Sequence, residues 1–553
     1  MIGLNKIGLN QVQLNRLHLN APFSTYRKMA GGGGSGDGFP QLPGDVTRWH
    51  FGGLTNEMMA AMDDPRLEDA DGKGRFLSFK NFLWGGMSGV GGYSDENHLT
   101  FYKFTLDDYV FIAIKSGVKY MNFTFRVTGL QPGNKLTLAF FGTTNTVYGT
   151  WDKDGIYTVN SAVVEVGKPV YFYNGYGSTR GTFTIEILPL YPGFILGDGV
   201  DDYAITEKEL NFEDTYTVYT AFIPFQDDPA RNMILCGKND TKDFSINYSG
   251  THLNFKPSTG VNLAVRIDQF ALLVCKRNKD ITTIINLSTG ESRSLKSVEF
   301  ISNPGLYYLW RNMFATFYAK AAIAGQIIDN GHFTTDEEDE NILNWHKKQY
   351  PWLFPDQAWT VTGKTNEDED RATIANITGN GNDLVLSNFG FIEGSGYNEE
   401  GGYAGYLVTD GVDDKIMSSA FTVGKDWTTV GEWEFLKEDA IKIAGIAKFG
   451  SFRFYNYSLT GRMNVYINSD LGTNVIGDSI KAATSKGSVC LDFNEVTEVT
   501  PGDAVDSGQS LFIGYNANNF TKLAFKNLAI YPTVLSKEDC IKAYNYLQTL
   551  KAK

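Results

Sequence analysis

Two acidic clusters in the sequence carry the side chains that a hard cation prefers. Both read Asp-Gly-Val-Asp-Asp, at 198–202 and at 410–414. Carboxylates and carbonyls at such close spacing can bind Ca2+, which takes about 6–8 oxygen ligands. Asp and Gly also begin strands and form turns without any ion, so both interpretations stay open. The candidate calcium ligands are Asp198, Asp201, Asp202, Asp410, Asp413 and Asp414.

Carbohydrate binding would need aromatic rings beside hydrogen-bonding groups. Residues 171–176 read Tyr-Phe-Tyr-Asn-Gly-Tyr, and strand alternation places Tyr171 and Tyr173 on one face and Phe172 on the other. Most aromatic residues of a β protein nevertheless belong to its core. The candidate glycan-binding residues are Trp151, Tyr171, Tyr173, Tyr176 and Trp427.

The sequence does not favour catalysis. Its six histidines form no HExxH pattern, and it has no GxSxG nucleophile motif. The four cysteines lie far apart without a CxxC pair, which indicates buried thiols in a reduced cytoplasm. We therefore expect a protein that is not an enzyme, although paired carboxylates that hydrolyse a glycan would leave no signature in the spacing of a β protein.

The net charge and the hydropathy of the chain argue against nucleic-acid-binding proteins and membrane-spanning proteins. A formal net charge of −14 argues against nucleic-acid binding, which needs clustered Lys and Arg. No apolar run approaches the roughly 18 residues that span a bilayer, so we expect no membrane insertion. The first residues lack the apolar core of a secretory signal, which predicts synthesis in the cytoplasm.

The composition and the N-terminus predict a β protein with an unusual leading segment. The sequence has 59 Gly, 29 Tyr and 38 Phe but 16 Pro, which is typical of a turn-rich, aromatic β protein. Residues 1–20 repeat a five-residue unit with two apolar residues two positions apart and an Asn. Such short turns cannot bury themselves, so we expect 1–30 to be an anchor that stacks on a partner; a disordered tail is the alternative. Residues 31–48 begin with a glycine-rich stretch and are interpreted as a linker.

A long internal duplication organises the rest of the chain. Trp49-x3-Gly53-x-Thr-Asn-Glu recurs as Trp359-x3-Gly363-x-Thr-Asn-Glu, and the acidic clusters follow in both copies. Each copy closes with a strand and then a helix. Thr335 or Ser536 is the residue just before the helix, and the acidic residue three positions later completes a capping pattern. We predict helices from 336 to about 347 and from 537 to about 550. The matched segments are 49–57 with 359–367, 71–82 with 378–389, 196–202 with 408–414, and 322–326 with 527–531.

The first copy is interrupted. Between the Asn-Phe pair and the acidic cluster it contains a much longer segment than the second copy, with alternating strands such as 121–127 and 135–140. We interpret this segment as a whole β-sandwich inserted into a loop, which costs little closure entropy. The expected domains are 1–30, 31–48, 49–93 with 193–350, the insertion 94–192, and 351–553.

Several motifs resemble known families. The motif Asp-Gly-Val-Asp-Asp, followed by Tyr203 or Lys415, resembles the strand-opening motif of laminin-G-like, concanavalin A-like jelly rolls. Residues 525–539 resemble the final strand and helix of the same family. This resemblance implies an all-β fold: two such β-sandwiches, the first carrying an inserted β-sandwich, behind a short β-repeat N-terminal anchor. Members of the family often hold Ca2+ at the rim of the sandwich.

A second resemblance concerns function. Residues 81–93 and 364–371 resemble sequence segments of structural proteins from tailed bacteriophages that infect Bacteroides, including crAss-like phages. This implies a virion protein, a head fibre or tail appendage, that is a homo-oligomer, by analogy with other fibres a trimer. It would contact other virion proteins through 1–30 and bind a host surface glycan. The alternative is a secreted or virion-borne carbohydrate-active enzyme or adhesin with laminin-G-like binding domains.

Overall fold

The computed structural model confirms the all-β fold class. All paired strands are antiparallel, and the longer helices of the described residues are α4 (Asp336–Gln349) and α5 (Lys537–Thr549). The expected anchor, 1–30, lies outside the described residues. The structure describes residues 38–54, 58–59, 61–82, 102–106, 109–112, 118–141, 145–165, 170–175, 183–188, 191–199, 201–225, 232–238, 244–249, 252–256, 262–266, 268–297, 304–311, 318–436, 444–458, 462–469, 472–477, 479–503, 508–516 and 519–552.

The first sandwich is built from two sheets whose facing side chains form one apolar core. Its first sheet has the order β1 (Asp45–His50), β23 (Lys320–Asn330), β14 (Tyr216–Pro224), β19 (Ala271–Arg277), β20 (Ile281–Asn286) and β21 (Glu291–Lys296), with β12 (Ile195–Asp198) also paired to β23. Its second sheet has the order β18 (Asn262–Ala264), β17 (His252–Lys256), β16 (Ser245–Ser249), β15 (Asn232–Lys238), β22 (Tyr307–Leu309), β13 (Tyr203–Thr206), β3 (Phe76–Lys80) and β2 (Arg66–Glu68).

The second sandwich has the same strand order, with one additional edge strand, β27, in its first sheet. Its first sheet has the order β27 (Gly396–Asn398), β28 (Tyr406–Val408), β41 (Leu523–Tyr531), β30 (Thr428–Phe435), β35 (Ala482–Thr484), β36 (Ser488–Cys490) and β37 (Val496–Glu498), with β24 (Gln357–Thr360) paired to β41. Its second sheet has the order β25 (Thr373–Ile374), β26 (Leu384–Ser387), β29 (Lys415–Ser418), β38 (Leu511–Ile513), β31 (Ala444–Lys448), β32 (Phe452–Ser458), β33 (Arg462–Ile467) and β34 (Thr473–Ile476). Strand by strand, β1 corresponds to β24, β23 to β41 and β14 to β30, and the second sheets match from β2 and β25 through to β18 and β34.

Local details repeat as well. The indole N–H of Trp49 donates to the carbonyl of Arg75 at 3.0 Å, and that of Trp359 donates to the carbonyl of Asn382 at 3.0 Å. Asn81 and Asn388 both adopt a left-handed backbone (φ 68° and 69°). Their side-chain amides donate to the carbonyls of Asp201 and Asp413, at 2.9 and 3.0 Å. The two copies therefore share turns and hydrogen bonds as well as strand order.

The closing strands correct one detail of the sequence alignment. Gln326 lies opposite Trp49, whereas Leu528 lies opposite Trp359. Gln326 therefore corresponds to Leu528, and the alignment with Tyr531 was wrong by three positions. Both strands are buried along almost their whole length, so their apolar residues show no period that could fix the register.

Between β3 and β12 the chain forms a further pair of sheets. The first contains β5 (Tyr109–Ile112), β10 (Val170–Gly175), β7 (Lys135–Phe141) and β8 (Asn145–Trp151). The second contains β4 (Tyr102–Leu106), β11 (Phe183–Leu188), β6 (Val118–Thr128) and β9 (Gly155–Glu165). The second sandwich has only β27 and the short helix η2 (Gly401–Tyr403) at the corresponding place. We call the extra sheets the inserted sandwich.

Both predicted helices are present. Thr335 accepts a hydrogen bond from the Glu338 N–H, and the Glu338 carboxylate accepts from the Thr335 N–H, which completes a capping box at α4. Ser536 caps α5 by accepting from the Asp539 N–H. The predicted starts are confirmed, and the ends lie within about two residues of the prediction.

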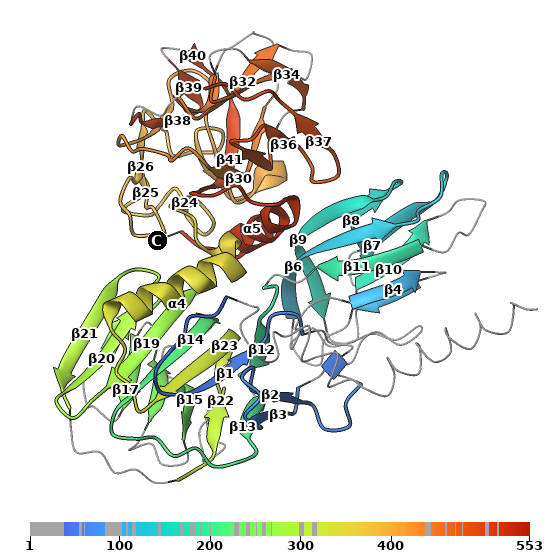
Figure 1. Ribbon diagram of the computed structural model, residues 1–553. Coiled ribbons are helices and arrows are strands. Elements are labelled where there is room, and N and C mark those ends of the chain that lie inside the picture. Colours follow the sequence, from blue (N-terminus) through green and yellow to red (C-terminus); the bar gives the residue numbers. More distant parts are fainter. Residues whose placement is uncertain are drawn as a thin grey trace, which may run out of the picture.

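Helix α5 lies where the three sandwiches meet (Figure 1). A single apolar cluster joins Ile223 of the first sandwich, Leu188 at the end of the inserted sandwich, Val430 of the second sandwich and Leu547 of α5. The short helix η1 (Pro351–Leu353) between the first and second sandwiches adds Trp352 to this cluster. Because burial of apolar surface is the main stabilising term in proteins, this shared cluster fixes the sandwiches relative to one another.

Candidate functional site

The second sheet of the second sandwich presents an aromatic surface away from the core. Ile416, Ile513 and Phe454 point into the core, while their strand neighbours point outward. Strand pairing sets the outward residues in one continuous row across six strands. In order of pairing, this row is Val385, Met417, Phe512, Ala447, Arg453 and Tyr466.

Further rings join this row and widen it. Phe512 lies edge-on to Phe449 (5.6 Å between ring centroids) and to Tyr515 (5.3 Å). Tyr515 stacks on Phe520 at 5.9 Å. Most of these rings are half-buried, so part of each ring is open to solvent. We call this surface the outer face, defined by Val385, Lys415, Met417, Phe449, Arg453, Tyr466, Phe512, Tyr515 and Phe520.

Cations accompany the rings of the outer face. The Arg453 guanidinium lies 4.8 Å from the Tyr466 ring centroid and 5.6 Å from that of Phe449. The Lys415 ammonium lies 5.9 Å from the rings of both Tyr515 and Phe520. None of the strands of this sheet contains an Asp or a Glu. On a chain with a formal charge of −14, a sheet without acidic residues is a local exception.

The first sandwich has a related pair at the equivalent place. The Arg311 guanidinium lies 3.8 Å from the Tyr203 ring centroid. Strand pairing makes Tyr203 correspond to Lys415. Arg311 corresponds to Tyr515, because the residue before each, Trp310 or Gly514, has the same left-handed backbone (φ 63° and 79°). The cation and the aromatic ring have therefore exchanged strands between the two copies.

One predicted glycan-binding residue is wrong. Trp427 is fully buried in the core of the second sandwich, and its indole N–H donates to the Asn468 side chain at 3.2 Å. A ring without exposed surface cannot stack on a ligand. Sequence reasoning missed this because a tryptophan near the start of a strand can face either side of a sheet.

The other aromatic candidates lie on the inserted sandwich. Phe172 is fully buried while Tyr171 and Tyr173 are half-buried, so the predicted alternation is confirmed. Trp151 pairs with the buried Leu136 and contacts the Phe125 ring at 4.9 Å, on the core side of its sheet. The structure therefore does not bring Trp151 together with the two tyrosines. Tyr176 lies outside the described residues.

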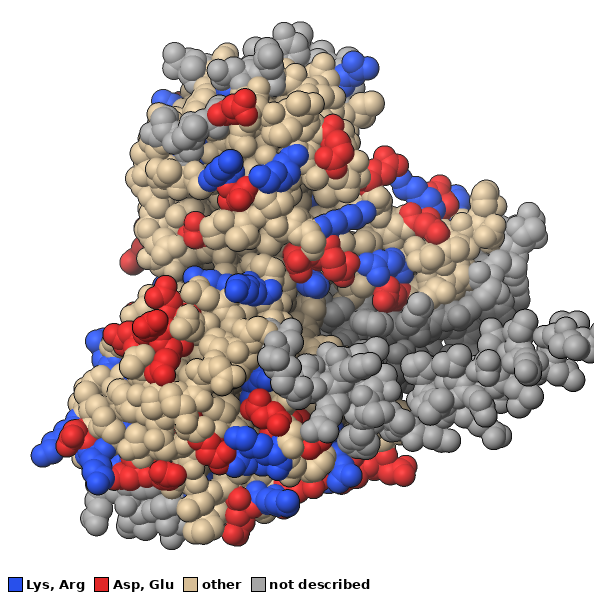
Figure 2. All heavy atoms as spheres, in the orientation of Figure 1, with Lys and Arg blue, Asp and Glu red and all other residues tan. Residues whose placement is uncertain are grey.

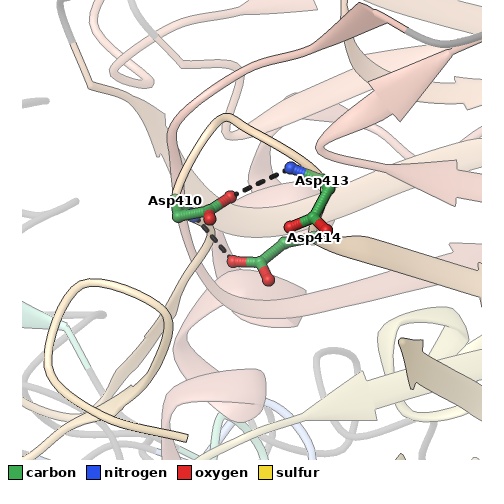
Figure 3. A group of neighbouring side chains, drawn as sticks. All are labelled: Asp410, Asp413 and Asp414. Carbon is green, nitrogen blue, oxygen red and sulfur yellow. Dashed lines mark hydrogen bonds between the residues drawn. The ribbon is translucent and has the colours of Figure 1, made fainter. Parts of the chain in front are cut away.

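The acidic cluster of the second sandwich is compact (Figure 3). Carboxylate oxygens of Asp410, Asp413 and Asp414 lie within 4.8 Å of one another. Asp410 Oδ1 accepts from the N–H of Val412 at 2.7 Å and from that of Asp413 at 3.3 Å. This arrangement is a turn stabilised by its own aspartate, with oxygens close enough for a cation.

Asp414 is the buried member of this cluster. Its Oδ2 accepts from the Asp410 N–H at 2.7 Å, and its Oδ1 accepts from the Ser395 hydroxyl at 3.2 Å. Burial raises the pKa of Asp414 to about 6, although both hydrogen bonds act in the opposite direction. In the first copy Asp202 is buried and Asp201 is exposed, while the Asp198 side chain lies outside the described part of the structure.

Surface charge gives no sign of a large basic area in the part of the molecule that can be seen in Figure 2. Basic and acidic side chains are interspersed on that face, and acidic residues gather at the start of α4, where the first turn contains Asp336, Glu337, Glu338 and Asp339. Negative charge at a helix N-terminus is favoured by the helix dipole. None of the helices in the described part of the chain is long and apolar enough to cross a membrane.

Known proteins were compared with this chain by sequence and by structure. No protein-family model matches the sequence, and no curated protein matches it. Partial structural similarity is found to the binding domain of botulinum neurotoxin DC in complex with rat synaptotagmin II (10% identity, 62% of this chain and 91% of that chain, TM-score 0.28). The binding domain of botulinum neurotoxin serotype C1 is similar to the same degree (9%, 62% and 91%, TM-score 0.27). The exoplasmic/lumenal domain of VIP36 in its Ca2+/Man3GlcNAc-bound form covers less (8%, 28% and 86%, TM-score 0.20). At such TM-scores the similarity assigns neither ligand nor activity to this chain.

Proposed function

We propose that this protein is a non-enzymatic glycan-binding protein that holds its ligand on the outer face of the second sandwich. The observation that carries the proposal is the row of aromatic rings and cations on a sheet without acidic residues. Sugar rings have apolar C–H faces that stack on aromatic side chains, and hydroxyls that need hydrogen-bond partners. Tyr466, Tyr515 and Arg453 offer both kinds of contact within one surface.

The wider assignment is a structural protein of a tailed bacteriophage, a head fibre or tail appendage that places these sandwiches on the surface of the virion. The support is the resemblance of residues 81–93 and 364–371 to phage structural proteins, together with the five-residue repeat of the N-terminus. In this proposal residues 1–30 bind other virion proteins or sister chains, and the chain is a homo-oligomer, by analogy with other fibres a trimer. The sandwiches then meet glycans of the host surface.

A glycan array with the full-length protein tests the binding proposal. We expect Tyr515→Ala to weaken binding to the recognised glycans by tenfold or more, equivalent to at least about 1.4 kcal/mol, because it removes a central ring. Tyr173→Ala on the inserted sandwich is the matched control and should leave binding unchanged. Loss of binding in Tyr173→Ala alone would place the site on the inserted sandwich, and absence of binding to any glycan would refute the proposal.

The virion assignment has its own test. Antibodies raised against the protein should label purified phage particles in electron microscopy. Light scattering should give a multiple of the monomer mass for the full chain and the monomer mass for a chain that lacks residues 1–38. Equal masses for the two chains would remove the support for an oligomerising anchor.

A further inference from the structure

A cavity of about 300 Å3 lies at the junction of the first and second sandwiches. Its walls come from six separate parts of the chain: the start of β19, the turn after β20, the segment around η1, the loop after β25, the residues after β41 and the C-terminal end of α5. Ligand pockets of proteins lie preferentially at such interfaces between domains, and this volume is at the lower end of their usual range.

Aromatic and proline rings form the apolar part of the cavity lining. Phe270 and Phe354 meet edge-on at 5.1 Å between ring centroids. The Tyr546 hydroxyl accepts a hydrogen bond of 2.9 Å from the Phe270 N–H, so α5 is tied to this part of the lining. Pro355 and Pro532 add further apolar surface to the lining. These groups suit the C–H face of a sugar ring and are fixed before any ligand binds.

The cavity lining also contains polar residues, among them Asp356. The Asp356 carbonyl accepts from the Asn380 amide at 2.8 Å and from the Thr378 hydroxyl at 3.1 Å, which fixes the loop. Among the residues that the structure describes, the Asp356 carboxylate has no hydrogen-bond or ion-pair partner. Asp356 is exposed to solvent, yet partial burial of its carboxylate raises its pKa, while the charge of Lys347 acts in the opposite direction.

We propose that this cavity is a second saccharide site, which takes one or two neutral sugar rings with Asp356 as the acceptor for their hydroxyls. A purely apolar ligand is disfavoured because the lining includes polar side chains, namely Asp356, Asn380, Thr378, Ser288 and Thr289. A carboxylate and an amide beside aromatic rings are instead the groups that orient a polyol. The class of ligand rests on the proposed function, whereas the location of the site rests on the cavity alone.

The experiment separates this site from the outer face. Saturation-transfer NMR is recorded on the full chain carrying Phe512→Ala and Tyr515→Ala, with glucose, galactose, mannose, maltose and cellobiose at millimolar concentration as probes. We expect saturation transfer to at least one probe from this background. Adding Asp356→Asn or Phe354→Ala should reduce it at least fivefold, whereas adding Asp152→Asn on the inserted sandwich should not.

Three outcomes would overturn the inference. The first is saturation transfer in the wild-type chain that disappears completely in the background, which would leave the proposed function intact with the outer face as the site. The second is a background signal that survives both Asp356→Asn and Phe354→Ala. The third is no signal from any of the five probes in the wild-type chain, while the glycan array tests the proposed function separately. Thermal unfolding of each variant confirms that it is folded.

Discussion

The Lys276 ammonium lies 2.6 Å from Asp339 Oδ2, and both side chains are almost completely buried (4% and 3% exposed). Tyr219 and Thr334 each donate a hydrogen bond of 2.7 Å to the other oxygen of this carboxylate. Asp339 belongs to the first turn of α4 and Lys276 to β19, so this network joins the helix to the first sheet. Removing one partner of a buried ion pair leaves an uncompensated charge in a low-dielectric site.

We therefore expect Asp339→Ala to lower the free energy of unfolding of the first sandwich by about 3–5 kcal/mol. Asp336→Ala is the matched control, because Asp336 is exposed and lies 4.0 Å from the same ammonium. Its loss should stay below about 1 kcal/mol. Urea unfolding followed by near-ultraviolet circular dichroism measures both. Equal losses in the two variants would contradict the importance of the buried pair.

The contact between α5 and the inserted sandwich predicts a coupling. The Thr124 hydroxyl donates a buried hydrogen bond of 2.7 Å to the Asn545 side-chain oxygen. In a double-mutant cycle with Thr124→Val and Asn545→Ala, we expect a coupling energy of about 1 kcal/mol in thermal unfolding. The cycle cancels the further hydrogen bond of Thr124 to Thr158. Additivity of the two variants would show that the inserted sandwich is not held by this contact.

Asp414 predicts a dependence of stability on pH. Burial raises its pKa in the folded protein from the ordinary 3.8 to about 6, so the protonated carboxyl favours the folded state. This contribution is fully present below a pH of about 3.8 and is lost as the pH rises through about 6. The melting temperature of the wild type should therefore fall relative to that of Asp414→Asn as the pH rises from about 3.8 to about 6. A difference that stays constant with pH would contradict the raised pKa.

The same cluster predicts the response to calcium. Asp410 Oδ1 and Asp414 Oδ2 accept hydrogen bonds from backbone N–H groups of the loop, and Asp414 Oδ1 accepts one from the Ser395 hydroxyl. We expect the melting temperature to change by less than about 1 °C between millimolar CaCl2 and a chelator, because Ca2+ raises the melting temperature only if it binds the folded protein. A rise of several degrees in CaCl2 that Asp413→Asn removes would instead establish a calcium site.

Local chemistry explains what the sequence alone determined. The duplication was visible because turns need particular residues: Asn81 and Asn388 adopt a left-handed backbone, and glycines occupy matching turns. The helix starts were visible because Thr335 and Ser536 satisfy backbone N–H groups that a helix leaves without partners. These signals lie within a few residues of one another, so no tertiary information is needed to find them.

Tertiary structure decided the register of the closing strands, the burial of Trp427 and the composition of both proposed sites. β23 and β41 are covered on both faces, so alternation could not show which residues face the core. The outer face joins residues from 385 to 520, and the cavity joins residues from 269 to 550, because antiparallel pairing and sandwich packing bring distant segments together. Spacing along a β chain says little about which side chains meet, since each strand chooses its neighbours only when the sheets form.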